Sequence, residues 1–158
     1  MGRRYPKIGD MVAICIRNRG ADLGAPFDRR AMHTLRSMFH LTVGSAYLVM
    51  GMGIFGSTLI VLVRDDTGKP NWLPVGLFDF GAQALSAGWE FSVTDARAAS
   101  GVSDPPKRWV AKWGYPELVR NPLHTDLLTE RDPTAIEIFN REVIAAEARA
   151  TKTSDDGQ

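Results

Sequence analysis

The sequence predicts an α+β fold: a small antiparallel β-barrel with an inserted helix and a C-terminal helical extension. Three observations carry this prediction. An uncharged apolar run with central glycines starts at Leu41, turn residues and alternating strands follow it as far as Thr94, and helical spacing of apolar residues dominates the last third. A chain of 158 residues has room for one domain with an appended helical part. We expect the barrel over residues 1–95, an inserted helix at about 28–40, the helical extension over 103–150 and a disordered tail at 151–158.

The uncharged run from Leu41 to Val63 has two interpretations. Its 23 residues are enough to cross a bilayer as a helix, and glycine does occur in membrane helices. However, glycines cluster within Gly51–Ser57, and the arm Thr58–Arg64 is rich in β-branched residues, which favour strands. The pattern therefore favours a β-hairpin with its turn at 51–57. A small membrane-anchored protein stays as an alternative.

A second turn and an edge strand follow the hairpin. Asp65–Asn71 contains Asp, Gly and Pro, which suit turn positions. Trp72-Leu73-Pro74 then predicts an edge segment, because proline removes no needed ladder donor there. Adjacent strand residues point to opposite faces, so Asp65 and Asp66 are expected to shape the turn rather than to share a cleft as an acid–base pair.

These parts resemble the SH3-like barrels of small phage- and plasmid-borne bacterial proteins. The resemblance covers about half of the chain, residues 8–80, and carries no catalytic motif. It rests on Ile8-Gly9-Asp10, Leu41-Thr42, Gly44, Tyr47, Val49, Asp65-Asp66, Gly68, Trp72, Pro74, Leu77 and Phe78. The resemblance implies a barrel with ligand-contacting loops, but a fold alone does not determine function.

The remaining elements are predicted from periodicity. Met11–Arg17 is expected to be a strand, and Asp28 is placed to cap a helix whose residues Leu35, Met38 and Phe39 pack on the barrel. Alternation over 89–94 predicts a closing strand with Trp89, Phe91 and Val93 inward. The helical extension is expected to begin at Pro105-Pro106 with an apolar stripe formed by Trp109, Val110 and Trp113, and to end with a helix that starts at Asp132-Pro133.

Charge and cysteine content limit the function classes. The net charge is +1, but residues 1–40 hold eight Lys or Arg against three Asp or Glu. The single cysteine, Cys15, lies in an apolar context, so we expect a small buried residue and no disulfide or thiolate metal site. No apolar segment directly follows the basic N-terminus, so a cytoplasmic bacterial location is expected.

The sequence contains no recognisable catalytic motif. The glycines at 44–56 match neither phosphate-loop pattern, no Gly-x-Ser-x-Gly is present, and His33, His40 and His124 lack a convincing set of metal ligands. The sequence therefore predicts no enzyme, no cofactor and no metal.

The leading hypothesis is a non-enzymatic protein-binding module with one protein partner. A concrete version is an immunity- or inhibitor-type protein of a bacterial conflict system that occludes a toxin or nuclease. Arg and Trp often dominate interface energies, and Trp72 is expected to be exposed near the inserted helix. The predicted partner-binding surface is therefore Arg29, Arg30, Arg36 and Trp72.

Nucleic-acid binding by a phage or plasmid accessory protein is the alternative from a different class. Its affinity would fall steeply with salt. The residues expected to carry it are Arg3, Arg4, Lys7, Arg17, Arg19, Arg29, Arg30 and Arg36.

Overall fold

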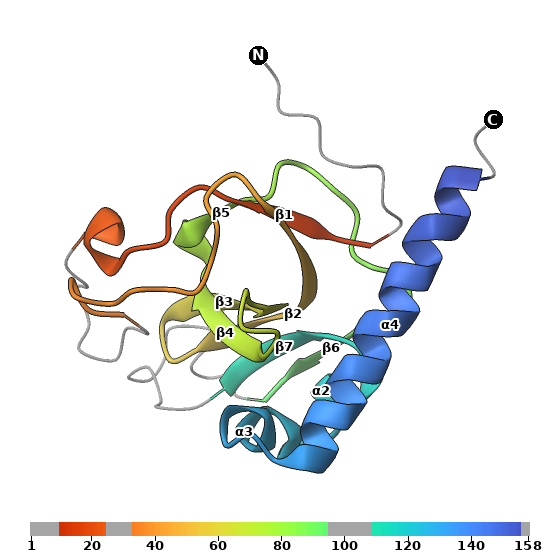
Figure 1. Ribbon diagram of the computed structural model, residues 1–158. Coiled ribbons are helices and arrows are strands. Elements are labelled where there is room, and N and C mark those ends of the chain that lie inside the picture. The colour runs from red at the N-terminus through yellow and green to blue at the C-terminus, as the bar shows by residue number, and fades with distance from the viewer. Residues whose placement is uncertain (1–9, 25–32, 95–108, 156–158) are drawn as a thin grey trace.

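A computed structural model describes residues 10–24, 33–94 and 109–155 of the chain (Figure 1). Its strands form one antiparallel seven-stranded sheet, so the predicted mixed α+β class is confirmed. The strands are β1 (Val12–Cys15), β2 (Ala46–Phe55), β3 (Thr58–Arg64), β4 (Pro70–Pro74), β5 (Phe78–Asp79), β6 (Glu90–Val93) and β7 (Trp109–Gly114). The helices are α2 (Pro116–Arg120), α3 (His124–Thr129) and α4 (Pro133–Asp155), with short 3-10 turns η1 (Gly20–Leu23) and η2 (Val75–Leu77).

Strand β2 is the centre of the sheet. Its first residues pair with β1, and its remaining length pairs with β3 on one side and β7 on the other. The order is β4-β3-β2-β1-β5, with β6 beyond β7. Within the described residues β4, β5 and β6 each have one strand neighbour, so the sheet is not closed. Of the predicted barrel, the antiparallel sheet is confirmed and the closure is not.

Both faces of the sheet are buried, and β3 shows why its sequence is continuously apolar. Val61 and Val63 point to one face, while Ile60 and Leu62 point to the other, and all four are fully buried. We call the first face the strand core; its members are Met11, Ala13, Cys15, Leu41, Tyr47, Val49, Val61, Val63, Leu73, Leu77 and Phe78. We call the second the helix core; its members are Met50, Ile60, Leu62, Trp72, Tyr115, Leu118, Leu128, Ala135, Phe139, Val143 and Ala146.

The predicted hairpin is present, but its turn lies later than predicted. β2 continues through Gly51 and Gly53 to Phe55, and the turn is at Gly56-Ser57, where Gly56 has φ 59°. The earlier glycines make room for side chains that lie on the sheet. A Cβ on Gly51 would stand 2.4 Å from Leu118 Cδ2, and one on Gly53 would stand 2.3 Å from the Trp109 ring. Packing, not a turn, requires glycine at these two positions.

The segment Trp109–Gly114 is a strand, which corrects the predicted helical stripe of Trp109, Val110 and Trp113. β7 pairs along the second half of β2 and with β6. Aromatic and β-branched residues suit a pleated surface, and pairing with the long free edge of β2 outweighs the weak helical spacing. The proposed start at Pro105-Pro106 lies outside the described residues.

The C-terminal helices are confirmed from α2 onwards. The Asp132 carboxylate accepts a hydrogen bond from the Ala135 N–H at 3.0 Å and so caps α4 as the Asp-Pro signal predicts. Figure 1 shows α4 running along one side of the molecule, with α2 and α3 beside its first half. The helix continues to Asp155, so the prediction of a disordered tail from 151 is wrong for residues 151–155.

The inserted helix is not found where the structure describes its predicted second half. Residues 33–40 form a turn and an isolated bridge between Arg19 and Met38. Phe39 packs against the strand core, but Leu35 and Met38 are 53% and 67% exposed rather than packed. Here local pairing with the segment after β1 replaces helical hydrogen bonds. The predicted cap Asp28 lies outside the described residues.

Side-chain exposure in β6 and the lengths of the helices test two further predictions. Phe91 and Val93 of the edge strand β6 are 55% and 45% exposed, so they do not point inward as predicted. Among the described residues, no helix has the length and apolar character that a membrane span requires. The run 41–63 is instead a loop followed by β2 and most of β3.

Candidate functional site

An open pocket lined by three aromatic rings lies where the sheet meets α3. We call it the aromatic pocket, and it has a volume of about 270 Å³. Its lining residues are Phe55, Ile60, Trp72, Trp109, Asp126, Thr129 and Glu130. Four strands and one helix contribute to it, so it exists only in the folded chain.

The strand register brings the aromatic rings together. Phe55 is the last residue of β2 and pairs with Trp109, the first residue of β7. Their rings meet edge to face, with centroids 5.4 Å apart. Trp72 of β4 packs on Trp109 with a centroid distance of 4.5 Å and an interplanar angle of 55°. The two tryptophans thus form one continuous aromatic wall, with Phe55 at its half-buried end.

Gly53 determines where the Trp109 ring lies. It is buried and stands two residues before Phe55, on the same face of β2. Because a Cβ there would overlap Cζ3 of Trp109, only glycine lets the indole lie against the strand. The glycine-rich sequence of β2 therefore helps to build the wall of the pocket.

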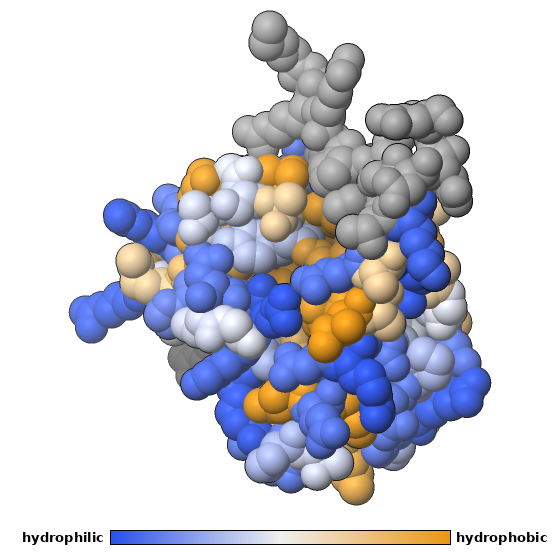
Figure 2. Space-filling view, turned by 45° about the vertical axis from the view of Figure 1, so that its right-hand side comes forward, coloured by the Kyte–Doolittle hydropathy of each residue, from blue (hydrophilic) through white to orange (hydrophobic). Residues whose placement is uncertain are grey.

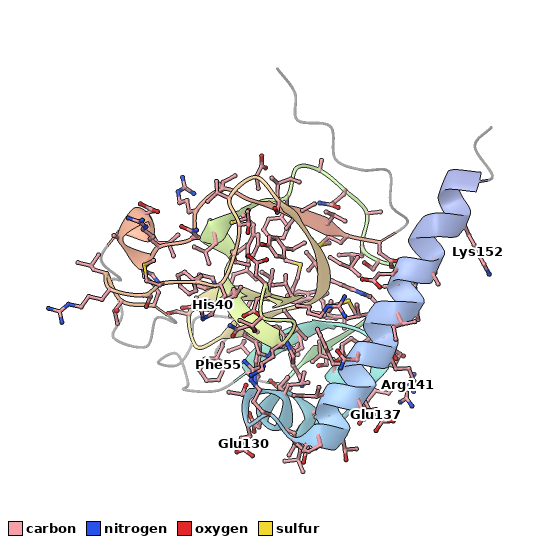
Figure 3. All side chains as sticks on the ribbon, in the orientation of Figure 1. His40, Phe55, Glu130, Glu137, Arg141 and Lys152 are labelled. Carbon is pink, nitrogen blue, oxygen red and sulfur yellow. The ribbon has the colours of Figure 1, made fainter. Side chains whose placement is uncertain are left out.

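The opposite rim of the aromatic pocket is acidic. Asp126 and Glu130 are both exposed and stand four residues apart, which places them on one side of α3. Figure 3 shows Phe55 and Glu130 on the same side of α4, whereas Glu137 and Arg141 project from its other side. The described side chains form no hydrogen bond or ion pair with either carboxylate of the rim.

Two cations near the rim are engaged elsewhere. Lys112 is 2% exposed, and its ammonium donates to the Leu118 carbonyl oxygen at 2.9 Å. Burial lowers the pKa of Lys112, while the charge of Asp126 acts in the opposite direction. Arg131 follows Glu130 in the chain, but its guanidinium donates to the Pro70 carbonyl oxygen. Neither cation is paired with Glu130.

The Trp72 indole N–H is buried and has no acceptor among the described groups. Trp72 as a whole is 8% exposed, and it also lines a smaller cavity of about 90 Å³ with Leu128 and Arg131. A buried donor without a partner costs about 1–3 kcal/mol, and such groups are rare in folded proteins. Trp72 is therefore held in place by its packing rather than by a hydrogen bond.

A buried polar pair supports α3 from behind the pocket. The Tyr115 hydroxyl and the His124 Nε2 are 2.7 Å apart, and both residues are almost fully buried. Burial raises the pKa of Tyr115 and lowers the pKa of His124, so each is held in its neutral form. This hydrogen bond ties the first residue of α3 to the end of β7.

A second open cavity, of about 280 Å³, lies between β2, α4 and residues 86–89. Asp10 and Arg149 lie on its wall, and the Arg149 guanidinium donates to both Asp10 carboxylate oxygens at 3.1 and 3.2 Å. These two charges satisfy each other, and Glu142 is a third charged residue of the lining. No group of three or more His, Cys, Asp or Glu side chains suited to a metal ion occurs in the described parts of the chain.

The structure corrects part of the predicted binding surface. Trp72 is buried under Trp109 and α3, so it is not the exposed aromatic that was predicted. Arg36 is exposed in the turn within 33–40, and its binding role stays a prediction. Arg29 and Arg30 lie outside the described residues.

Sequence reasoning missed most of the pocket. The sequence predicts Phe55 in a turn and Trp109 on a helix, and it gives Asp126 no role in a pocket. The available signals are two tryptophans, Trp72 and Trp109, which the sequence predicts on separate elements, and a glycine two residues before Phe55. Neither signal shows which strands are neighbours, so the pocket could not be assembled from them.

The chain was compared with known proteins. No family model, curated protein or solved structure matches it. Function is therefore inferred from the residues of the pocket itself.

Proposed function

We propose that this protein is a binding module that holds a segment of a protein partner in the aromatic pocket. The observation that carries the proposal is an open pocket with rings of Phe55, Trp72 and Trp109 on one side and, on the other, two carboxylates that form no ion pair with a described side chain. Aromatic side chains in pockets are the residues that most often dominate binding energies. Ligand sites are typically apolar with a few placed polar groups.

The size of the pocket, about 270 Å³, fits a partner segment of limited contact area. On the face of the molecule that Figure 2 shows, small apolar patches are separated by hydrophilic side chains. A large apolar face would favour a permanent complex, whereas small patches suit the docking of a short segment. This arrangement supports recognition of an extended peptide or loop.

Two finer statements belong to the same proposal. The SH3-like resemblance is supported by the antiparallel order β2-β3-β4 and the 3-10 turn η2 after Trp72-Leu73-Pro74. The inhibitor role, in which the chain occludes a toxin or nuclease, stays a prediction from the sequence. So does the nucleic-acid alternative, since most of the basic residues named for it lie outside the described segments or are spread over exposed loops.

Selection from a random peptide library displayed on phage tests the proposal. Peptides selected on the full chain are expected to bind Phe55→Ala at least about tenfold more weakly, because the lost ring is half-buried in the pocket. Phe91→Ala is the matched control. Phe91 is also a partly exposed aromatic stacked on a tryptophan, with centroids 4.9 Å apart, but it lies on β6 away from the pocket.

The control defines the opposing result. If no peptides are selected, or if Phe55→Ala and Phe91→Ala weaken binding equally, the aromatic pocket is not the binding site. A melting temperature for each variant close to that of the original chain confirms that the comparison is between folded proteins.

A further inference from the structure

We infer that the partner presents an arginine side chain to the aromatic pocket, whose guanidinium lies between the aromatic wall and the carboxylates of Asp126 and Glu130. This inference rests on the proposed function and names the chemistry that the pocket selects. Three observations support it: the composition of the two walls, the charges of the rim, and the hydrogen bonds that the nearby cations make to carbonyl oxygens.

The aromatic wall favours a cation over a neutral apolar group. Ring faces carry negative partial charge and attract ammonium and guanidinium groups, and tryptophan does so best. Two of the three rings here are tryptophans in mutual contact. A purely apolar ligand would gain from the rings but would leave the acidic rim desolvated without compensation.

The two carboxylates of the acidic rim repel each other in the free protein. Like charges at positions i and i+4 of a helix destabilise it, and Glu130 stands at the C-terminal cap of α3, where a negative charge is unfavourable, although Asp126 lies in the first turn, where it is favourable. Natural sequences depart from such local rules mainly at functional sites. A guanidinium bound between Asp126 and Glu130 would remove this repulsion.

Arginine fits better than lysine for a geometric reason. The guanidinium is planar, stacks on aromatic faces and presents several N–H donors that can reach two carboxylates at once. Among the described residues, Lys112 and Arg131 donate to the carbonyl oxygens of Leu118 and Pro70, and Lys112 acts on Asp126 only through its charge. A guanidinium that contacts both carboxylates is therefore expected from the ligand.

Nuclear magnetic resonance of the full chain labelled with ¹⁵N-tryptophan tests the inference. The chain has four tryptophans, and only Trp72 and Trp109 line the pocket. Titration with N-acetyl-arginine amide is expected to shift these two indole N–H signals saturably and to leave those of Trp89 and Trp113 in place. The variants Trp89→Phe and Trp113→Phe assign the signals. N-acetyl-citrulline amide, the neutral isostere, is expected to bind at least about fivefold more weakly.

Charge variants complete the test. The double variant Asp126→Asn, Glu130→Gln is expected to lose at least about fivefold in affinity for the arginine compound. Glu137→Gln is the matched control, because Glu137 is an exposed acid on the other side of α4 (Figure 3) and should behave as the original chain. Both are surface substitutions that leave the two cores intact.

Several results would overturn the inference. They are the absence of a saturable shift, equal binding of the citrulline compound, and unchanged affinity in the double variant. N-acetyl-lysine amide binding as tightly as the arginine compound would overturn the assignment to arginine. If selected peptides depend on Phe55 but contain no arginine and ignore the double substitution, the proposed function stands and this inference fails.

Discussion

The strand core and the helix core differ in what they bury. In the strand core the Tyr47 hydroxyl, a polar atom, reaches the edge, where it donates to the Asp66 carboxylate at 2.7 Å. The helix core borders buried polar groups of Tyr115, Lys112 and His124, and it opens into the aromatic pocket. Both cores therefore contain groups that titrate, but the helix core is the one that adjoins the aromatic pocket. The helix side of the sheet carries the candidate site.

The largest expected effect breaks the helix core directly. Leu62→Asp places a charge at a fully buried position of β3, which costs several kcal/mol against a typical total stability of about 5–15 kcal/mol. We expect this variant to be unfolded by circular dichroism at room temperature. Leu59→Asp is the control, since Leu59 lies in the same strand but is 37% exposed and should leave a cooperative melt. A folded Leu62→Asp protein would show that β3 is not central to the core.

A smaller effect is expected where the sheet supports the aromatic wall. Gly53→Ala places a Cβ against the Trp109 ring and close to the Ala111 carbonyl oxygen, so the ring must move. Overpacking of this kind costs about 1–3 kcal/mol in the free energy of unfolding, measured with a chemical denaturant. In a Trp109→Ala background the same substitution should cost less, because the clash with the ring is absent. Equal costs in both backgrounds would contradict the role of Gly53.

Acid should weaken the helix core through His124. Because burial lowers its pKa in the folded state, the unfolded chain binds a proton more readily as pH falls below the unfolded pKa of about 6.5. The stability that neutral His124 provides is therefore fully present above that pH and is lost as pH decreases below it. We expect the denaturant concentration at the unfolding midpoint to be lower at acidic pH than at pH 7.5. His124→Gln should remove this dependence, and an unchanged dependence in that variant would contradict the assignment.

The smallest effect is expected at the edge of the strand core. Asp66 accepts hydrogen bonds from the Tyr47 hydroxyl and from Thr42 Oγ1, each at 2.7 Å, and these bonds hold its pKa below its usual value. Asp66→Asn should cost about 1 kcal/mol at neutral pH. The stability from the carboxylate is present above the unfolded pKa and is lost as pH falls through the lower folded pKa. The difference between the two proteins in urea unfolding should therefore shrink in strong acid, and a constant difference would rule out the carboxylate as its cause.

The parts of the fold that were predictable from sequence are governed by local chemistry. β-Branched residues in Thr58–Arg64 indicated a strand, Asp132-Pro133 indicated a helix start, and the Asp65–Asn71 composition indicated a turn whose Asp65 carboxylate does accept the Thr67 N–H. Cys15 was expected to be buried, and it is. Each of these signals depends on residues close together in the chain.

Contacts between distant segments decided the rest. In the sequence Gly51 and Gly53 resemble turn residues, but in the structure Leu118 and Trp109 pack over them. The segment Trp109–Gly114 has weak helical spacing, but it forms a strand because it pairs with the edge of β2. The aromatic pocket combines Phe55, Trp72 and Trp109 with α3. No pattern within a few residues of the sequence shows that these elements are neighbours. The mixed α+β class, the central hairpin and the last helix were predictable because hydrophobic period and turn chemistry act over a few residues. Strand order, the position of each tryptophan and the site were not, because they depend on which surfaces meet across the sheet.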